Sequence, residues 1–172
     1  MIMAQFTIAV ELLLLQEGGY NPKDAGNAGC ANFGITQRWM YNLVYPLLTW
    51  ENAGHAVKSL SRSQAITLYK IHMWDRYSMG GIQNQTVTNA LLNAMVNMGE
   101  QTAVKILQRV LKVKADGVIG PITLTTLNRS APQDLLPLWK ITLANRYRAI
   151  AAKKPGSPLK SWLRRLDRIF AS

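Results

Sequence analysis

Glu17 is the residue whose type and position best suit acid–base chemistry in this chain of 172 residues. It ends the apolar stretch ELLLLQEGGY, and in a helix that turns by about 100° per residue it shares a face with Val10 and Leu13. A carboxyl group against apolar walls at a helix C-terminus resists ionisation, so we expect it to hold a proton near neutral pH. Such an acid suits the protonation of a leaving sugar oxygen. The alternative is a helix-terminal acid that the two following glycines turn towards solvent.

The other acidic residues limit the choice of a second catalytic group. Of the nine Asp and Glu residues, four are expected at helix starts or on solvated faces: Glu51, Glu100, Asp134 and Asp167. Asp24 and Asp75 remain as candidates, whereas Asp116 precedes a glycine and is typical of a turn. Trp74, beside Asp75, either stacks on a sugar ring or packs in the core, and the core is the commoner place for a Trp at a helix end.

Two helical patterns place further polar side chains where a ligand can bind. One stripe consists of Asn89, Asn93, Asn97 and Glu100. It is either a solvated face or the edge of a cleft whose amides bind N-acetyl groups. In the other pattern Arg146 is aligned with Trp139 and Leu143 on an apolar face. We therefore expect the Arg146 guanidinium to be buried. Its partner is expected to be an acidic side chain in an ion pair, and the alternative is a bound ligand.

The net charge of +11 belongs to the second half of the chain. Residues 1–92 contain six Lys and Arg against five Asp and Glu, whereas residues 93–172 contain fourteen against four. A basic surface suits a polyanion: nucleic acid, anionic lipid or a bacterial wall rich in carboxylates and phosphodiesters. Aromatic residues are not interleaved with the basic ones in a nucleic-acid recognition motif, so nucleic acid is not expected as a partner.

Cysteine and histidine are scarce, and this limits the disulfides and metal sites that the chain can form. With one cysteine, Cys30, and two histidines, the chain forms no intramolecular disulfide and no Cys/His metal cluster, so neither a metal nor a cofactor is expected. The opening MIMAQFTIAVELLLL lacks the basic start and cleavage site of a signal peptide and is too short to span a bilayer. We expect synthesis in the cytoplasm, no stable membrane insertion and a monomer.

Helical periodicity dominates the chain and predicts a mainly α fold. Residues 20–36 are expected to form a loop or a small irregular hairpin. The predicted helices cover residues 3–16, 37–46, 62–75, 85–98 and 100–111, a short segment opened by Pro121, a long one from Asp134 to about Lys153, and 159–170. The best internal boundary is near residue 99, where the charge balance changes, so we expect domains at 1–98 and 99–172.

Four motifs occur in order in the first half: EGGY (17–20), NFGIT (32–36), MWD (73–75) and VNMG (96–99). Together with Asp24 they resemble the glycoside hydrolase family 108 N-acetylmuramidases, which are lysozyme-like phage endolysins and bacterial proteins of holin-dependent toxin secretion. The segment LQRVLKVKADGVIGPITLTTL (107–127) resembles the peptidoglycan-binding module usually fused to them. The resemblance implies a lysozyme-like, mainly α fold with a minimal hairpin, in which an N-terminal catalytic lobe packs against a C-terminal helical module.

The resemblance also assigns roles. It makes Glu17 the catalytic acid, and it leaves Asp24 or Thr36 to position the water. Two positions depart from the family pattern: Ala31 stands where many members have Thr, and Asn93 where many have Asp. The side chains expected to bind substrate are Tyr20, Asn32, Trp74, Asn93, Asn97, Arg146 and Trp162.

The sequence therefore predicts a peptidoglycan hydrolase that cleaves the β-1,4 bond between N-acetylmuramic acid and N-acetylglucosamine, for cell lysis or for protein secretion. A lytic transglycosylase that uses the same glutamate is one alternative, because it needs no activated water. A catalytically silent wall-binding adaptor is another. The resemblance implies a holin or a dedicated pore through which the enzyme reaches the wall.

Overall fold

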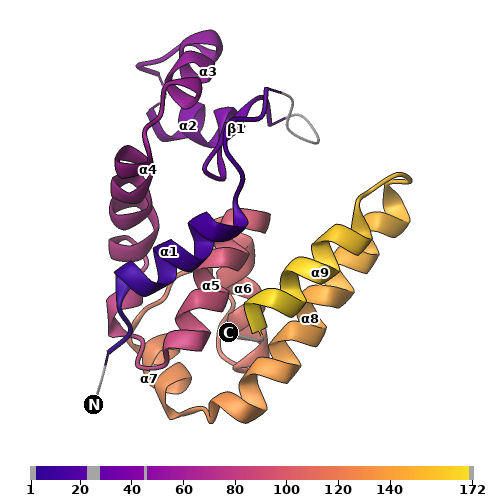
Figure 1. Cartoon of the computed structure of the whole chain (residues 1–172). Helices are drawn as coiled ribbons and strands as arrows, with labels where there is room; N and C mark the ends of the chain where they lie inside the picture. The colour runs from indigo at the N-terminus through magenta and orange to yellow at the C-terminus, as the bar shows by residue number, and fades with distance from the viewer. Residues whose placement is uncertain (1–2, 23–27, 45, 171–172) are drawn as a thin grey trace.

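The chain folds into helices, several of which pack around one central helix, as a computed structural model of residues 3–22, 28–44 and 46–170 shows (Figure 1). The α-helices of these residues are α1 (Phe6–Gln16), α2 (Gln37–Val44), α3 (Trp50–Lys58), α4 (Arg62–Tyr69), α5 (Gln85–Met98), α6 (Glu100–Val110), α7 (Pro121–Arg129), α8 (Pro132–Lys153) and α9 (Leu159–Phe170). A π-helical turn, Lys70–Asp75, continues α4, and a 3-10 turn covers Met79–Gly81. Strands β1 (Ala31–Asn32) and β2 (Ile35–Thr36) form an antiparallel hairpin. The mainly α fold with a minimal hairpin is confirmed.

Helices with strong local signals were predicted well. The segments expected at 85–98 and 159–170 coincide with α5 and α9. Ser61 and Gln64 form the expected capping box at the start of α4. The segment expected at 62–75 is helical throughout, although its last six residues widen into the π-helical turn.

Two predicted helix starts need correction, and one helix was missed. The first helix begins at Phe6 rather than at residue 3. The long helix α8 begins at Pro132, where a proline fits the first turn, so Asp134 lies inside that turn and does not cap the helix. Helix α3 was missed, because its sequence WENAGHAVK carries few apolar residues; Thr49 caps it by accepting a hydrogen bond from the Asn52 N–H group.

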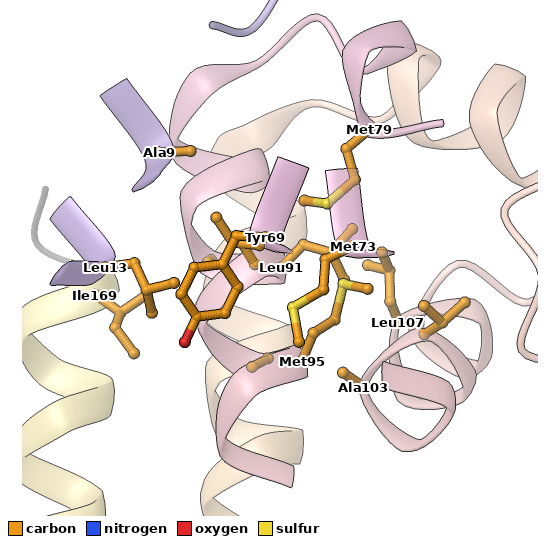
Figure 2. Packing of buried hydrophobic residues seen from close by; sticks show 14 of the residues in the cluster. Ala9, Leu13, Tyr69, Met73, Met79, Leu91, Met95, Ala103, Leu107 and Ile169 are labelled. Atoms are coloured by element: carbon orange, nitrogen blue, oxygen red, sulfur yellow. The ribbon is translucent and has the colours of Figure 1, made fainter. Parts of the chain in front are cut away.

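Helix α5 forms the centre of the core. Nine consecutive residues, 87–95, are buried, because α5 is covered by α1, α6, α9 and the π-helical turn. Figure 2 shows Leu91 and Met95 of this helix in one buried cluster with Tyr69 and Met73, and with Leu107 from α6. A helix that is buried all round holds its neighbours in fixed positions. Near its C-terminal end, Asn93 donates a hydrogen bond to Gln16 Oε1 at the end of α1.

The C-terminal segment consists of α6, a loop, α7 and the antiparallel pair α8 and α9 (Figure 1). The loop is held by Gln108, which is fully buried. Its side-chain amide donates to Asp116 Oδ1 (2.8 Å) and to the Val118 carbonyl (2.9 Å), and its Oε1 accepts from the Gly117 N–H group (2.8 Å). Hydrogen bonds from the Val118 N–H group and from Gln108 lower the pKa of Asp116. Asp116 is therefore the turn residue that the sequence predicted.

Replacing Gln108 by Ala should destabilise the protein by about 3 kcal/mol, because it leaves the Gly117 N–H group and the Val118 carbonyl without their buried partner. Urea denaturation measures the effect. Gln101→Ala, on the exposed face of the same helix, is the matched control and should change the free energy of unfolding by less than about 0.5 kcal/mol. Equal transition midpoints for the two variants would contradict this role for Gln108.

Candidate active site

Glu17 is the residue immediately after α1, and its side chain lies at the junction of several elements. Its N–H group donates to the Leu13 carbonyl (3.1 Å), while its φ of −86° and ψ of 131° turn the chain out of the helix. Only 11% of the side chain is exposed. A Cβ added to either Gly18 or Gly19 would meet no atom within 4 Å. Glu17 is thus a shielded carboxyl group with open space beside the next two residues, as a bulky substrate requires.

The hairpin turn packs directly against Glu17. Phe33 (φ 52°) and Gly34 (φ 78°) form a two-residue turn with positive φ at both positions, which suits the twist of a short hairpin. A Cβ on Gly34 would lie 2.8 Å from Glu17 Cγ and 2.8 Å from the Tyr69 hydroxyl oxygen. Only glycine allows this approach, so the NFGIT motif fixes where the Glu17 side chain lies.

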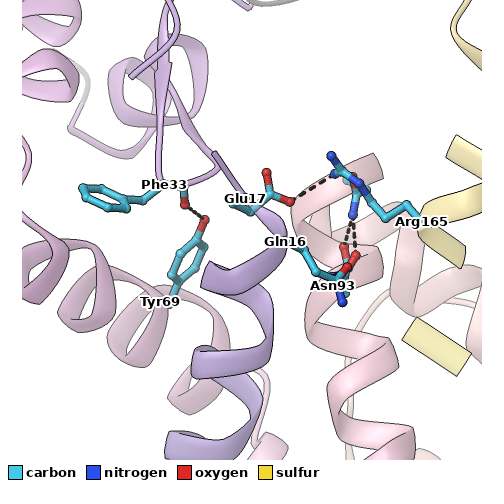
Figure 3. A network of polar contacts seen from close by, with 7 residues as sticks. Gln16, Glu17, Phe33, Tyr69, Asn93 and Arg165 are labelled. Atoms are coloured by element: carbon cyan, nitrogen blue, oxygen red, sulfur yellow. Dashed lines mark hydrogen bonds and ion pairs between the residues drawn. The ribbon is translucent and has the colours of Figure 1, made fainter. Parts of the chain in front are cut away.

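Tyr69, at the end of α4, holds the hairpin turn from the other side (Figure 3). Its hydroxyl donates to the Phe33 carbonyl at 2.8 Å. Burial raises the pKa of Tyr69 well above its ordinary value, and the neighbouring charge of Glu17 raises this pKa further. The phenol therefore remains a neutral hydrogen-bond donor throughout the physiological pH range.

Arg165 reaches Glu17 from α9. Its Nη1 lies 3.0 Å from Glu17 Oε1 and also donates to Asn97 Oδ1 (Figure 3). Asn97 in turn donates to the Asn93 carbonyl (2.8 Å), and Asn93 donates to Gln16 Oε1 (3.1 Å). The two asparagines therefore belong to a polar network that joins α1, α5 and α9, and they do not form a solvated face. Arg165 was not among the site residues expected from the sequence, because no local signal links residues so distant in the chain.

A pocket of about 230 Å³ is lined by Gly34 and Tyr69, the two residues that approach Glu17, although Glu17 itself is not among its lining residues. Thr36 lines the pocket, and its hydroxyl accepts a hydrogen bond from the Trp39 N–H group (3.1 Å). Glu100 also lines it, with its Oε1 accepting from Trp39 Nε1 at 2.6 Å. Glu100 is the first residue of α6, as expected for an acid at a helix start, and Trp39 holds its half-buried carboxylate at the pocket. The wall beside Glu17 therefore offers oxygen atoms to polar groups of a ligand.

Three of the expected substrate-binding residues lie in the interior: Asn93, whose contacts are given above, Trp74 and Asn32. Trp74 is 5% exposed and packs edge-on against Phe6, with ring centroids 5.3 Å apart, so it presents no open face to a sugar. Asn32 is 6% exposed and donates to the carbonyls of Val57 (3.1 Å) and Leu60 (3.2 Å), which ties the hairpin to the end of α3. All three positions are filled by structural contacts, and the core alternative for Trp74 is confirmed.

Arg146 also departs from its prediction, because it is exposed and not buried. Tyr147 takes the inward position on α8 instead, and its ring lies 5.3 Å from that of half-buried Trp162. Arg146 borders a surface groove together with Arg109 and Lys153. No acidic partner of Arg146 is found in the described part of the chain.

The remaining predicted residues lie at the surface or outside the described residues. Tyr20 is exposed, and Asp75 forms an exposed ion pair with Lys70. Asp24 falls within 23–27, outside the described residues. Within residues 3–22, 28–44 and 46–170, no group of three His, Cys, Asp or Glu side chains is arranged to hold a metal ion. No helix in these ranges has the length and apolar character needed to span a membrane.

The chain is similar to known proteins over most of its length. The family model described as Glycosyl hydrolase 108 matches residues 10–99, and the one described as "Predicted Peptidoglycan domain" matches residues 102–167. The structure of SagA from Brucella abortus is similar over 96% of this chain and 91% of that chain, with a TM-score of 0.81 and 25% sequence identity. No curated protein sequence matches the chain.

Proposed function

The chain belongs to glycosyl hydrolase family 108, and on that premise we propose that it is an N-acetylmuramidase, which cleaves the β-1,4 bond between N-acetylmuramic acid and N-acetylglucosamine. Together with its match to the peptidoglycan domain, this membership makes the protein a peptidoglycan hydrolase with a lysozyme-like, mainly α fold. The observation that carries the choice of bond is Glu17, a carboxyl group shielded on one side and open on the other, next to a pocket lined with oxygen atoms.

Glu17 acts in this proposal as the general acid. It gives its proton to the glycosidic oxygen while the bond from that oxygen to the anomeric carbon breaks. A water molecule then adds its hydroxyl group to the anomeric carbon, and its remaining proton passes through solvent to the Glu17 carboxylate, which restores the acid. Thr36 and Asp24 are the groups proposed to position that water. Glycine at 18 and 19 leaves room for the sugar rings beside the acid.

The basic C-terminal segment suits a substrate of negative charge, because the peptidoglycan wall carries many carboxylates. The proposed wall contacts of this segment are Trp162, which packs against Tyr147, and the exposed Arg146. We place the enzyme's action outside the inner membrane, in cell lysis or protein secretion, with a holin or a dedicated pore for its passage.

Mass spectrometry of the products tests the reaction. Purified sacculi treated with the protein should release muropeptides that end in reducing N-acetylmuramic acid. Products with 1,6-anhydro ends would instead identify a lytic transglycosylase that uses the same acid without water. Binding to sacculi without any release would identify a silent adaptor.

A further inference from the structure

Arg165 is a charged side chain of the C-terminal segment that contacts the proposed catalytic acid. The two residues lie 148 positions apart in the sequence, yet the guanidinium and the carboxylate are 3.0 Å apart, with 27% and 11% of their side chains exposed. Leu166 and Ile169, both 3% exposed, anchor α9 in the core beside Arg165. The backbone of Arg165 is therefore fixed, while its long side chain extends into the site.

This ion pair opposes the role of Glu17 as a proton donor. A guanidinium beside a carboxylate favours the ionised form, whereas a general acid must carry its proton when the substrate is bound. The phenols that face Glu17 from other helices do not alter this balance, because burial raises the pKa of Tyr69 on α4 and of Tyr147 on α8, so that both stay neutral. Before the reaction can proceed, the Arg165 guanidinium must move away from Glu17 or take another anion as partner.

The Arg165 guanidinium has N–H groups that can bind a second anion. A guanidinium carries five N–H groups in a planar fork that fits carboxylates. The contacts with Glu17 and Asn97 both use Nη1, and Nε and Nη2 make no hydrogen bond within residues 3–22, 28–44 and 46–170. The stem peptides of peptidoglycan bear free carboxylates close to the glycan chain. Arg165 is thus placed to exchange Glu17 for a carboxylate of the substrate.

We propose that Arg165 is a substrate-released latch on Glu17, and that it makes the enzyme specific for glycan strands that carry carboxylate-bearing peptides. In the free protein Arg165 holds the Glu17 carboxylate. A carboxylate of the bound strand takes over the guanidinium, Glu17 takes up a proton from water, and this proton then passes to the leaving oxygen. The inference rests on the proposed function, because it assumes that Glu17 is the general acid.

The test compares two forms of one substrate: native sacculi and the same sacculi with their carboxyl groups converted to amides. Amidation should lower kcat/KM of the wild-type protein about tenfold, as expected for the loss of one charge-assisted hydrogen bond. Arg165→Gln should lose this discrimination. Arg164→Gln removes the same charge from the exposed neighbouring position and should discriminate as the wild type does, so it accounts for the general attraction between a basic protein and an anionic wall.

The pH dependence of kcat/KM gives a second readout. Arg165 favours ionised Glu17 in the free protein, so its replacement by Gln should shift the alkaline limb upward by about one pH unit. Arg165→Lys, which keeps the charge, and Arg164→Gln should both retain the wild-type limb. Two results would overturn the proposed latch. One is an alkaline limb of Arg165→Gln at the wild-type pH. The other is equal discrimination between native and amidated sacculi by Arg165→Gln and Arg164→Gln. Failure of the wild type to cleave native sacculi would instead overturn the proposed function.

Discussion

Replacing Glu17 by Gln should lower peptidoglycan hydrolysis about a thousandfold, because the amide keeps the shape of the side chain but has no acidic proton to donate. The protein should stay folded, since the Gln side-chain oxygen can still accept a hydrogen bond from Arg165. The release of reducing ends from purified sacculi measures the rate, and circular dichroism checks the fold.

Glu11→Gln is the matched control for this variant. Glu11 lies on the same helix and forms an exposed ion pair with Arg62, so the control removes one negative charge from α1 without touching the site. Its activity should remain within about twofold of the wild type, because exposed ion pairs contribute little. If Glu17→Gln kept more than about a tenth of the wild-type rate, another group would have to be the general acid.

Replacing Gly34 by Ala should lower kcat/KM about a hundredfold, because the new methyl group would displace the Glu17 side chain from its working position. The Cβ would lie 2.8 Å from Glu17 Cγ and 2.8 Å from the Tyr69 hydroxyl oxygen, and both of these atoms are held by their own contacts. The φ of 78° adds backbone strain of about 1 kcal/mol, so the melting temperature should also fall by several degrees.

Gly156→Ala is the control that separates the effect of backbone strain from the effect of steric contact with Glu17. Gly156 has a φ of 84°, and a Cβ there would meet no atom within 4 Å. This control should lose similar stability through its backbone but keep the wild-type kcat/KM. Activities that fall equally in the two variants would show that strain alone, and not contact with Glu17, explains the loss in Gly34→Ala.

Most of the helices could be predicted from the sequence, because their signals are local. The capping box at Ser61 and the periodic pattern at 85–98 depend on residues within one or two turns of each other. The same holds for Glu17, whose spacing from Val10 and Leu13 predicted a shielded side chain at the end of α1. These features depend on short-range geometry that every helix shares.

Tertiary packing decided which side chains are buried at positions where the sequence pattern allowed two answers. Positions 146 and 147 are both close to the apolar face of α8, since three and four residues after Leu143 are nearly equivalent on a helix. Contact with α9 turned Tyr147 inward and left Arg146 exposed. Trp74 and Glu100 were likewise placed by partners from other elements, Phe6 and Trp39.

The sequence by itself determined the helices, the basic second half and the acid at the end of the first helix. Only the tertiary structure brought Gly34, Tyr69 and Arg165 to that acid. Their contacts with Glu17 join four separate elements across up to 148 positions, and no pattern within a helix or a turn encodes such a distance. The physical reason is that closure of the core around α5 sets where these elements meet, and this depends on the packing of the whole chain at once.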